Sequence, residues 1–369
     1  MPTTPAGSRP IVMTEVDQFG GAERSVVALS RWLYEHHLPN HVVTYFDRCD
    51  LAGHATHPLE VIQLKPAPGP RNKIAALRRY FREYAAPKPL LSGYQPALHA
   101  TLAGMRGFHV LMHDTASLFG DQALRPSKAK LRIAASNRII GHGLRSGGST
   151  IVTSEYLRSE CRKDFNIDAK IARMGGLNPA ASNPRPRAVE EQLHMLSVCR
   201  IESNKRIDWI LRSLAELEHS ATPLSSRIDW RLDLAGSGSL IPALQQMAKD
   251  LDIGGRIRFH GFVPDQDLEQ LYSEAHLFLM PAVQGYGIPA IESLQRGIPV
   301  LLHRESGVSD ILLDTPWATV LNGGEDLMTD TMRLAIDGVL NGRHHNIPQP
   351  ELPTEDSWAE QVARLCNWL

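Results

Sequence analysis

The sequence lacks several features that mark special classes of protein. No run approaches the roughly 20 apolar residues of a membrane-spanning helix, and residues 1–10 lack the apolar stretch of a signal peptide. No internal repeat or low-complexity segment is visible. The four cysteines have no metal-like spacing, and they are Cys49, Cys161, Cys199 and Cys366. We therefore expect a cytoplasmic protein with reduced thiols.

A large net charge is also absent, because the formal net charge is −1. The charge is unevenly distributed, however, since residues 65–145 contain fourteen lysines and arginines against three acids. Residues 71–82 are basic and amphipathic, and residues 125–145 add further basic side chains. This pattern predicts an anionic partner, either the inner membrane surface or a lipid-linked diphosphate acceptor; a solvated helix face is the alternative. Few aromatic residues lie among these charges, which argues against nucleic acid.

Short apolar runs alternate with stretches of helical periodicity, which is typical of α/β domains with parallel sheets. The chain is long enough for about two domains. A segment rich in Pro, Asn and Ser at residues 177–187 indicates a linker between them. The pattern predicts strands over residues 11–14, 41–46, 110–113, 150–153, 194–199, 230–235, 257–260 and 276–281. It predicts helices over residues 24–37, 207–217, 265–275, 330–340 and 357–369.

The most informative segment is residues 284–292, with the sequence Gln-Gly-Tyr-Gly-Ile-Pro-Ala-Ile-Glu. It indicates a glycine-rich turn between a buried strand and a short helix. Gly285 and Gly287 allow the backbone to approach a ligand closely. The free N–H groups at the start of the helix favour an anion such as a diphosphate. Glu292 lies one turn inside the helix, where its carboxylate can accept two hydrogen bonds from a sugar diol.

This segment resembles the donor-sugar motif of the retaining glycosyltransferases of family 4. The family pattern is Glu, seven residues, Glu, around an aromatic-Gly-Leu/Ile-Pro core, which Tyr286, Gly287 and Ile288 match. Glu292 matches the second acid, which holds the nucleotide ribose in the family. Gln284 occupies the first position, where the family's acid helps to hold the donor sugar, and Gln can hydrogen-bond a hydroxyl but carries no charge.

The resemblance implies the GT-B fold, in which two Rossmann-like domains face a central cleft. We expect an acceptor-binding domain over residues 1–180 and a nucleotide-sugar-binding domain over residues 190–355. The terminal helix within residues 356–369 is expected to pack back on the first domain. The implied substrates are a GDP- or UDP-linked sugar and a glycan or lipid-linked acceptor, and no other cofactor is expected.

A second match is the strand-Arg-loop-Lys segment, in which Arg200 and Lys205 would bind the donor diphosphate. Two cations at the carboxyl end of a strand can neutralise such a leaving group. The family usually has Lys-Gly there, whereas this chain has Lys205 followed by Arg206. A solvated basic loop is the alternative interpretation.

Two turns after later strands match the family as well. Gly236 and Gly238 follow a strand, in a turn that lies beside the nucleotide in the family; a simple tight turn explains them equally well. Phe262 and Val263 match a Gly-aromatic-Val segment that lies near the base, although Phe262 also suits a core position.

In the first domain, Gly20 and Gly21 resemble the family's Gly-Gly-Ala-Glu loop at the interdomain cleft. Glu23 is explained equally by the preference for acids in the first turn of a helix. His113 ends a predicted strand, and strand ends face the ligand crevice in open α/β sheets. The family has a His at such a strand end in contact with the donor sugar, with Asp114 as the alternative polar contact here.

No metal site is predicted. Asp265 and Asp267 have the spacing of a metal-binding acid pair, but they follow a proline at a helix start, where acids are expected. His344 and His345 lie in a Gly/Asn/Pro-rich segment and are expected to be exposed.

These observations predict a retaining glycosyltransferase that moves a hexose, with mannose as the first guess, in surface-polysaccharide or glycolipid assembly. The uncharged Gln284 raises an alternative from another class, a non-catalytic GT-B subunit that binds nucleotide-sugar and assists a partner transferase. A third reading is a nucleotide-sugar epimerase, which needs acids in the cleft that the sequence does not clearly supply.

Overall fold

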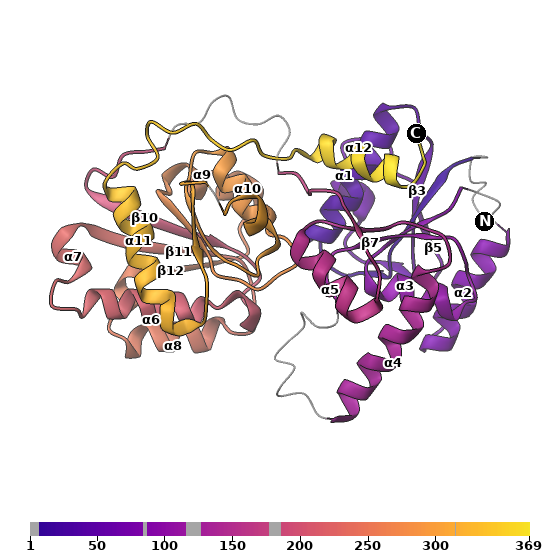
Figure 1. The fold of residues 1–369 in the computed structure, drawn as a ribbon, viewed down its shortest axis with the longest axis horizontal. Helices are drawn as coiled ribbons and strands as arrows, with labels where there is room; N and C mark the ends of the chain where they lie inside the picture. Colours follow the sequence, from indigo (N-terminus) through magenta and orange to yellow (C-terminus); the bar gives the residue numbers. More distant parts are fainter. Residues whose placement is uncertain (1–6, 84–86, 116–126, 177–185, 314) are drawn as a thin grey trace. The chain divides into compact units, whose positions relative to one another are not determined.

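The structure, a computed structural model, describes residues 7–83, 87–115, 127–176, 186–313 and 315–369. The chain forms two compact units, one from residues 1–178 and 353–369 and the other from residues 179–352 (Figure 1). Each unit is built around its own parallel sheet, which confirms the predicted α/β class. The expected linker, residues 177–187, lies outside the described residues except for residues 186 and 187.

The N-terminal unit contains a seven-stranded parallel sheet with the order β5-β3-β1-β6-β7-β8-β9. Its strands are β1 (Arg9–Val12), β3 (Asn40–Thr44), β5 (Val61–Gln63), β6 (Leu90–Ser92), β7 (His109–Met112), β8 (Thr150–Val152) and β9 (Lys170–Ile171), with a separate pair β2 (Glu15–Val16) and β4 (Phe46–Asp47). Its helices are α1 (Gly21–Glu35), α2 (Pro70–Glu83), α3 (Tyr94–Leu102), α4 (Ser127–Leu144), α5 (Glu155–Phe165) and α12 (Glu355–Leu365), with a 3-10 turn at η1 (Leu51–His54). The central strands are buried on both faces, which explains their continuous apolar sequences.

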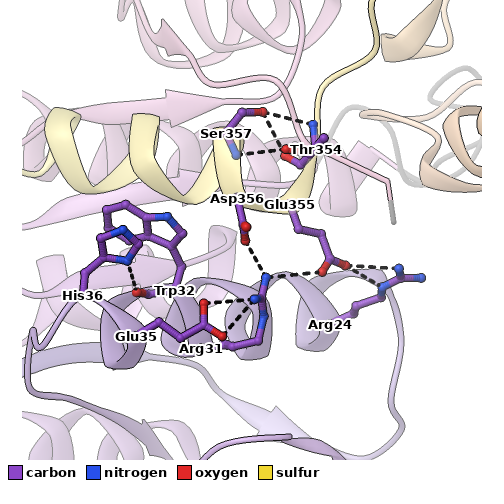
Figure 2. Close-up of polar contacts among 9 residues, drawn as sticks. All are labelled: Arg24, Arg31, Trp32, Glu35, His36, Thr354, Glu355, Asp356 and Ser357. Atoms are coloured by element: carbon purple, nitrogen blue, oxygen red, sulfur yellow. Dashed lines mark hydrogen bonds and ion pairs between the residues drawn. The ribbon is translucent and has the colours of Figure 1, made fainter. Parts of the chain in front are cut away.

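The terminal helix α12 packs along α1 (Figure 2). The Arg24 Nε donates to Glu355 Oε1 at 3.1 Å, and the Arg31 Nη2 donates to Asp356 Oδ1 at 2.6 Å. Thr354 caps α12, since its Oγ1 accepts a hydrogen bond from the backbone N–H three residues on, at 3.2 Å. The buried face of α12 consists of Trp358, Ala359, Val362 and Ala363. Two carboxylates in the first turn of α12 therefore hold two arginines of α1.

The C-terminal unit contains a six-stranded parallel sheet with the order β12-β11-β10-β13-β14-β15. Its strands are β10 (Gln192–Val198), β11 (Asp229–Ala235), β12 (Ile257–Gly261), β13 (Leu277–Met280), β14 (Val300–His303) and β15 (Ala318–Leu321). Its helices are α6 (Ile207–Glu218), α7 (Leu224–Arg227), α8 (Ile241–Asp250), α9 (Asp265–Glu274), α10 (Ile288–Gln295) and α11 (Met328–Leu340), with 3-10 turns η4 (Ser203–Lys205), η5 (Gly254–Arg256), η6 (Gly307–Ile311) and η7 (Glu325–Leu327). The apolar face of α6 is buried as predicted, and it comprises Ile207, Ile210, Leu211, Leu214 and Leu217.

The prediction that His344 is exposed was wrong. Only 5% of His344 is exposed, and its Nε2 lies 2.8 Å from the carbonyl oxygen of Pro316. The ring also packs beside Trp317, with 5.4 Å between ring centroids. Its neighbour His345 is exposed, as expected.

Candidate active site

The predicted donor residues of the C-terminal unit gather where the strand order reverses. Strand β10 lies beside β13, although the chain first continues to β11 and β12. Open parallel sheets bind ligands at such a switch point. The segments that follow β10 and β13 are in contact, because Val283 N donates to Asn204 O at 3.2 Å and Asn204 Nδ2 donates to Val283 O at 3.3 Å. Next to this pair, Lys205 Nζ donates to Gln284 Oε1 at 2.5 Å.

Both ends of the Gln284 amide are engaged within the protein. The amide oxygen accepts from Lys205, while Nε2 donates to Met280 Sδ at 3.0 Å and lies 3.4 Å from Ser306 Oγ. The amide therefore fixes the position of the Lys205 ammonium group. Because the amide is neutral, this contact is not an ion pair, whereas a glutamate at position 284 would form an ion pair with the ammonium.

The turn that follows Gln284 requires glycine. Gly287 has φ of 138°, and a Cβ there would lie 2.6 Å from Met280 Cε and 2.8 Å from Gln284 Nε2. Helix α10 begins at Ile288, directly after this glycine, with proline in its first turn. The predicted strand, glycine turn and short helix are thus present. Pro289 has no N–H, and the Ala290 N–H donates to the Gly287 backbone oxygen at 3.0 Å.

Glu292 lies in α10 and is 6% exposed. Tyr272 of α9 donates its hydroxyl to Glu292 Oε2 at 3.3 Å. The guanidinium of Arg296 stacks over the Tyr272 ring at 4.5 Å and donates to the backbone oxygen of Glu292 at 2.9 Å. The carboxylate therefore has a structural partner. A test of its role in ligand binding must separate that role from the contact with Tyr272.

The basic segment after β10 contains two arginines that differ in their contacts and in their backbone conformation. Arg200 is exposed, and its guanidinium lies 3.4 Å from the Glu202 carboxylate. Arg206 has φ of 55°, in the left-handed region that favours glycine, and it stacks on Trp209 at 4.1 Å. The family's usual Lys-Gly pair has its glycine at this same position. A left-handed residue other than glycine costs roughly 1–2 kcal/mol, and the cation–π contact offsets part of this cost.

The glycines after β11 are required by a close approach to the loop after β10. A Cβ on Gly236, which has φ of 135°, would lie 1.8 Å from the backbone oxygen of Cys199. A Cβ on Gly238 would lie 2.1 Å from the backbone oxygen of Ile201. Both glycines therefore have a purely structural explanation, which does not depend on a nucleotide.

Phe262 is 79% exposed, which excludes the core position that was its alternative. It follows Gly261, whose backbone oxygen accepts a hydrogen bond from Gly236 N at 2.7 Å. The loop with Phe262 and the half-buried Val263 therefore lies beside the Gly236 turn. An exposed ring next to a glycine turn is available to stack on a planar ligand.

In the N-terminal unit, Gly20 and Gly21 form the start of α1. Glu23 lies in the first turn of α1, as the alternative interpretation expected, and its Oε2 also accepts a hydrogen bond from the Gly20 N–H at 3.1 Å. Ala22 and Glu23 line a cavity of about 920 Å³.

His113 follows β7 and lines the same cavity. Its Nε2 lies 2.9 Å from Ser92 Oγ, and burial lowers the pKa of His113 to about 4. The imidazole is therefore neutral at pH 7, and it can hydrogen-bond a hydroxyl group without adding charge. Asp114 also lines the cavity, next to His113.

The predicted site residues thus form two groups. Gly20, Gly21 and His113 belong to the N-terminal unit, and the others belong to the C-terminal unit. Sequence reasoning missed Asn204 and Ser306, whose types are too common to signal a role. Within the described residues, no cluster of three or more metal-ligating side chains is present, and no helix is long and apolar enough to cross a membrane.

The match to a known family lies mainly in the C-terminal unit. Residues 181–323 match the family model described as glycosyl transferases group 1. Over 243 residues the chain is 28% identical to a GDP-mannose-dependent alpha-(1-6)-phosphatidylinositol monomannoside mannosyltransferase of Mycolicibacterium smegmatis, covering 58% of this chain and 60% of that protein. It is 26% identical to the O-antigen chain mannosyltransferase B of Escherichia coli, covering 66% and 63%. The chain therefore spans about 60% of the length of these curated relatives.

Solved structures match almost the whole fold. The crystal structure of WaaG, a glycosyltransferase involved in lipopolysaccharide biosynthesis, aligns with a TM-score of 0.73 at 17% identity, over 97% of this chain and 99% of that one. Anabaena HepE in complex with UDP aligns with a TM-score of 0.69 at 14% identity, over 98% and 100%. The chain therefore has the GT-B fold, and its residues 181–323 are similar in sequence to the group 1 glycosyltransferases.

Proposed function

We propose that this protein is a retaining glycosyltransferase that moves a hexose from a nucleotide-sugar to a glycan or lipid-linked acceptor. The observation that carries the proposal is the contact of Lys205 with Gln284 at the switch point, directly before the start of α10. A cation close in sequence and space to the positive end of a helix dipole suits a diphosphate. The similarity of residues 181–323 to group 1 glycosyltransferases supports the same reading.

On this proposal, Arg200 and Lys205 stabilise the negative charge that develops on the leaving diphosphate. Glu292 holds the ribose, while Gln284 and His113 orient the sugar. The acceptor hydroxyl attacks the anomeric carbon from the face that the diphosphate leaves, as the bond to the diphosphate oxygen breaks. That oxygen takes the hydroxyl proton. Because attack and departure occur on the same face, the configuration is retained without a covalent enzyme intermediate.

GDP-mannose is the first donor to test, because two of the relatives are mannosyltransferases and one is described as GDP-mannose-dependent. The full chain would be incubated with GDP-mannose or UDP-glucose and a hydroxylic acceptor, and the anomeric configuration of the product read by NMR. We expect transfer with retention, and a loss of about 100-fold in rate for Lys205→Met, a magnitude typical of removing one charge-stabilising group. Lys249→Met, on the exposed side of α8, is the matched control. An inverted product would contradict the retaining mechanism.

The non-catalytic alternative rests on Gln284. Its amide is satisfied by Lys205, Met280 and Ser306, an arrangement that a purely structural residue would also show. A chain that binds nucleotide-sugars but transfers no sugar to any acceptor would favour this alternative over the transferase.

The proposal includes attachment to an anionic membrane surface through α2. Arg71, Arg79 and Arg82 are exposed on this helix. Arg78 differs, because its guanidinium donates to the backbone oxygens of Ala103 and Leu102 at the end of α3, at 2.9 Å and 3.2 Å. It caps a helix and should be left unchanged in a test.

Each basic residue near an anionic surface contributes about 1 kcal/mol. A variant with glutamine at positions 71, 79 and 82 should therefore bind anionic vesicles about 100-fold more weakly in a sedimentation assay. Unchanged binding would exclude α2 as the attachment site.

A further inference from the structure

The cavity of the N-terminal unit has two chemically different sides. Its polar side is formed where strands end, with Glu15 beyond β1 and His113 beyond β7. Its other side is formed by helices, where Leu98 and Leu102 lie one turn apart on α3 and Ile133 faces the cavity from α4. Helices α3 and α4 pack against each other, and these three side chains, which we call the apolar wall, line the same cavity.

A smaller cavity of about 460 Å³ adjoins the polar side and is cationic. It shares Glu15, His99 and Arg132 with the larger cavity and adds Lys73. Lys73 forms an ion pair with Glu15, and burial together with the charge of Lys73 lowers the pKa of His99. The charges of Lys73 and Glu15 cancel, and His99 is neutral. The exposed Arg132 therefore gives the smaller cavity a net positive charge, which suits a phosphate group.

The apolar wall continues to the surface. Leu102 lines the cavity and is 41% exposed at the end of α3, whereas Leu131 is 73% exposed on a face of α4 that does not line the cavity. The N-terminal half of α4 extends away from the sheet (Figure 1) and carries the exposed Lys128 and Arg132 beside Leu131. Exposed leucines next to basic side chains complement an apolar chain with an anionic group. A purely hydrophilic acceptor would use only the polar side.

We propose that these two cavities bind an amphiphile in which a saccharide or polyol head is joined through a phosphate or diphosphate to an apolar chain. Arg132 binds the phosphate, and the chain lies against Leu98, Leu102 and Ile133. The head then lies on the polar side near His113. This inference rests on the proposed function, since it makes the acceptor lipid-linked and assigns the residues that select it.

The test uses octyl, decyl and dodecyl phosphate, each below its critical micelle concentration, titrated into the full chain by calorimetry. Affinity should rise by up to about four-fold for each added methylene, which corresponds to about 0.8 kcal/mol. The double variant Leu102→Ser, Ile133→Ser should flatten this dependence on chain length, while Arg132→Gln should weaken all three ligands by about 10-fold. Leu334→Ser, a 63% exposed leucine on α11 of the other unit, is the matched control and should change nothing.

Affinity that is independent of chain length, or a chain-length dependence that the double variant keeps, would overturn the proposal. Inorganic phosphate bound as tightly as dodecyl phosphate would identify a phosphate site only, and would also overturn it. The outcome is separable from that of the proposed function, because nucleotide-sugar binding is titrated independently. Alkyl phosphate binding without any nucleotide-sugar binding would leave this site in place and refute the transferase.

Discussion

Replacing Gln284 by glutamate changes one charge at the centre of the candidate site and almost nothing else. The Gln284 amide oxygen lies 2.5 Å from Lys205 Nζ, so the new carboxylate would form an ion pair with that ammonium. Its second oxygen would replace the amide nitrogen that contacts Met280 and Ser306. Since one favourable contact is strengthened and two are weakened, the free energy of unfolding should change by only about 1 kcal/mol.

The effect on ligand binding should be much larger. A phosphate bound to Lys205 would lie about 6 Å from the new carboxylate, and two unit charges at that distance repel by about 3 kcal/mol at an effective dielectric constant of 20. We therefore expect Gln284→Glu to weaken GDP or UDP binding by about 100-fold. The transfer rate at low donor concentration should fall with it.

Calorimetric titration of the wild-type chain and the variant with GDP and UDP would measure this difference. Gln245→Glu, an exposed residue on α8, makes the same change of charge away from the site and should bind like the wild type. If Gln284→Glu binds nucleotide as well as the wild type, the diphosphate does not lie at Lys205. If it binds nucleotide and transfers sugar faster, Gln284 marks a degenerate site, and the non-catalytic reading gains support.

Three further predictions concern the fold that positions the site. Gly236→Ala would place a Cβ 1.8 Å from a backbone oxygen of the loop after β10, so it should lower the free energy of unfolding by more than about 3 kcal/mol in urea denaturation. Glu355→Gln removes the ion pair with Arg24 and should lower that free energy by about 1 kcal/mol, whereas Glu35→Gln, at an exposed pair, should lower it by less than half as much. His41 is fully buried with a pKa lowered to about 4, so the unfolded chain takes up its proton below pH 6.5 while the native chain does not. The free energy of unfolding should therefore fall by about 2.5 kcal/mol between pH 7 and pH 4.5 on account of this group, and His41→Asn should remove that part of the pH dependence.

Features set by local sequence could be predicted. The buried face of α6 follows from apolar side chains at helical spacing, which any periodicity reveals. The start of α5 is capped by Ser154, whose Oγ accepts from Leu157 N at 3.1 Å, and serine is among the residues preferred at this position. The turn into α10 was recognisable from its glycines, and the structure leaves no room for a Cβ at Gly287. Each of these features depends on residues within one or two turns of chain.

Features that depend on distant parts of the chain could not be predicted. The burial of His344 depends on Pro316 and Trp317, which approach it only in the folded unit. The contact of Tyr272 with Glu292 joins α9 and α10, which β13 separates in the sequence, and neither sequence segment signals it. Position 206 matches a family glycine, but the local pattern does not reveal that the arginine of this chain adopts a left-handed conformation.

The most direct test of the central claim is thermal stabilisation of the chain by a panel of UDP-, GDP-, ADP- and TDP-sugars. A ligand present at about 100 times its dissociation constant should add roughly 2.7 kcal/mol to the free energy of unfolding. Glu292→Gln is the informative variant because it removes the charge of the carboxylate that is proposed to hold the ribose. Tyr272→Phe is its control, because it removes the internal contact of that carboxylate and leaves the carboxylate itself unchanged. We expect a shift with one nucleotide, lost in Glu292→Gln and kept in Tyr272→Phe. No shift with any nucleotide-sugar would contradict the claim that this unit binds a sugar donor.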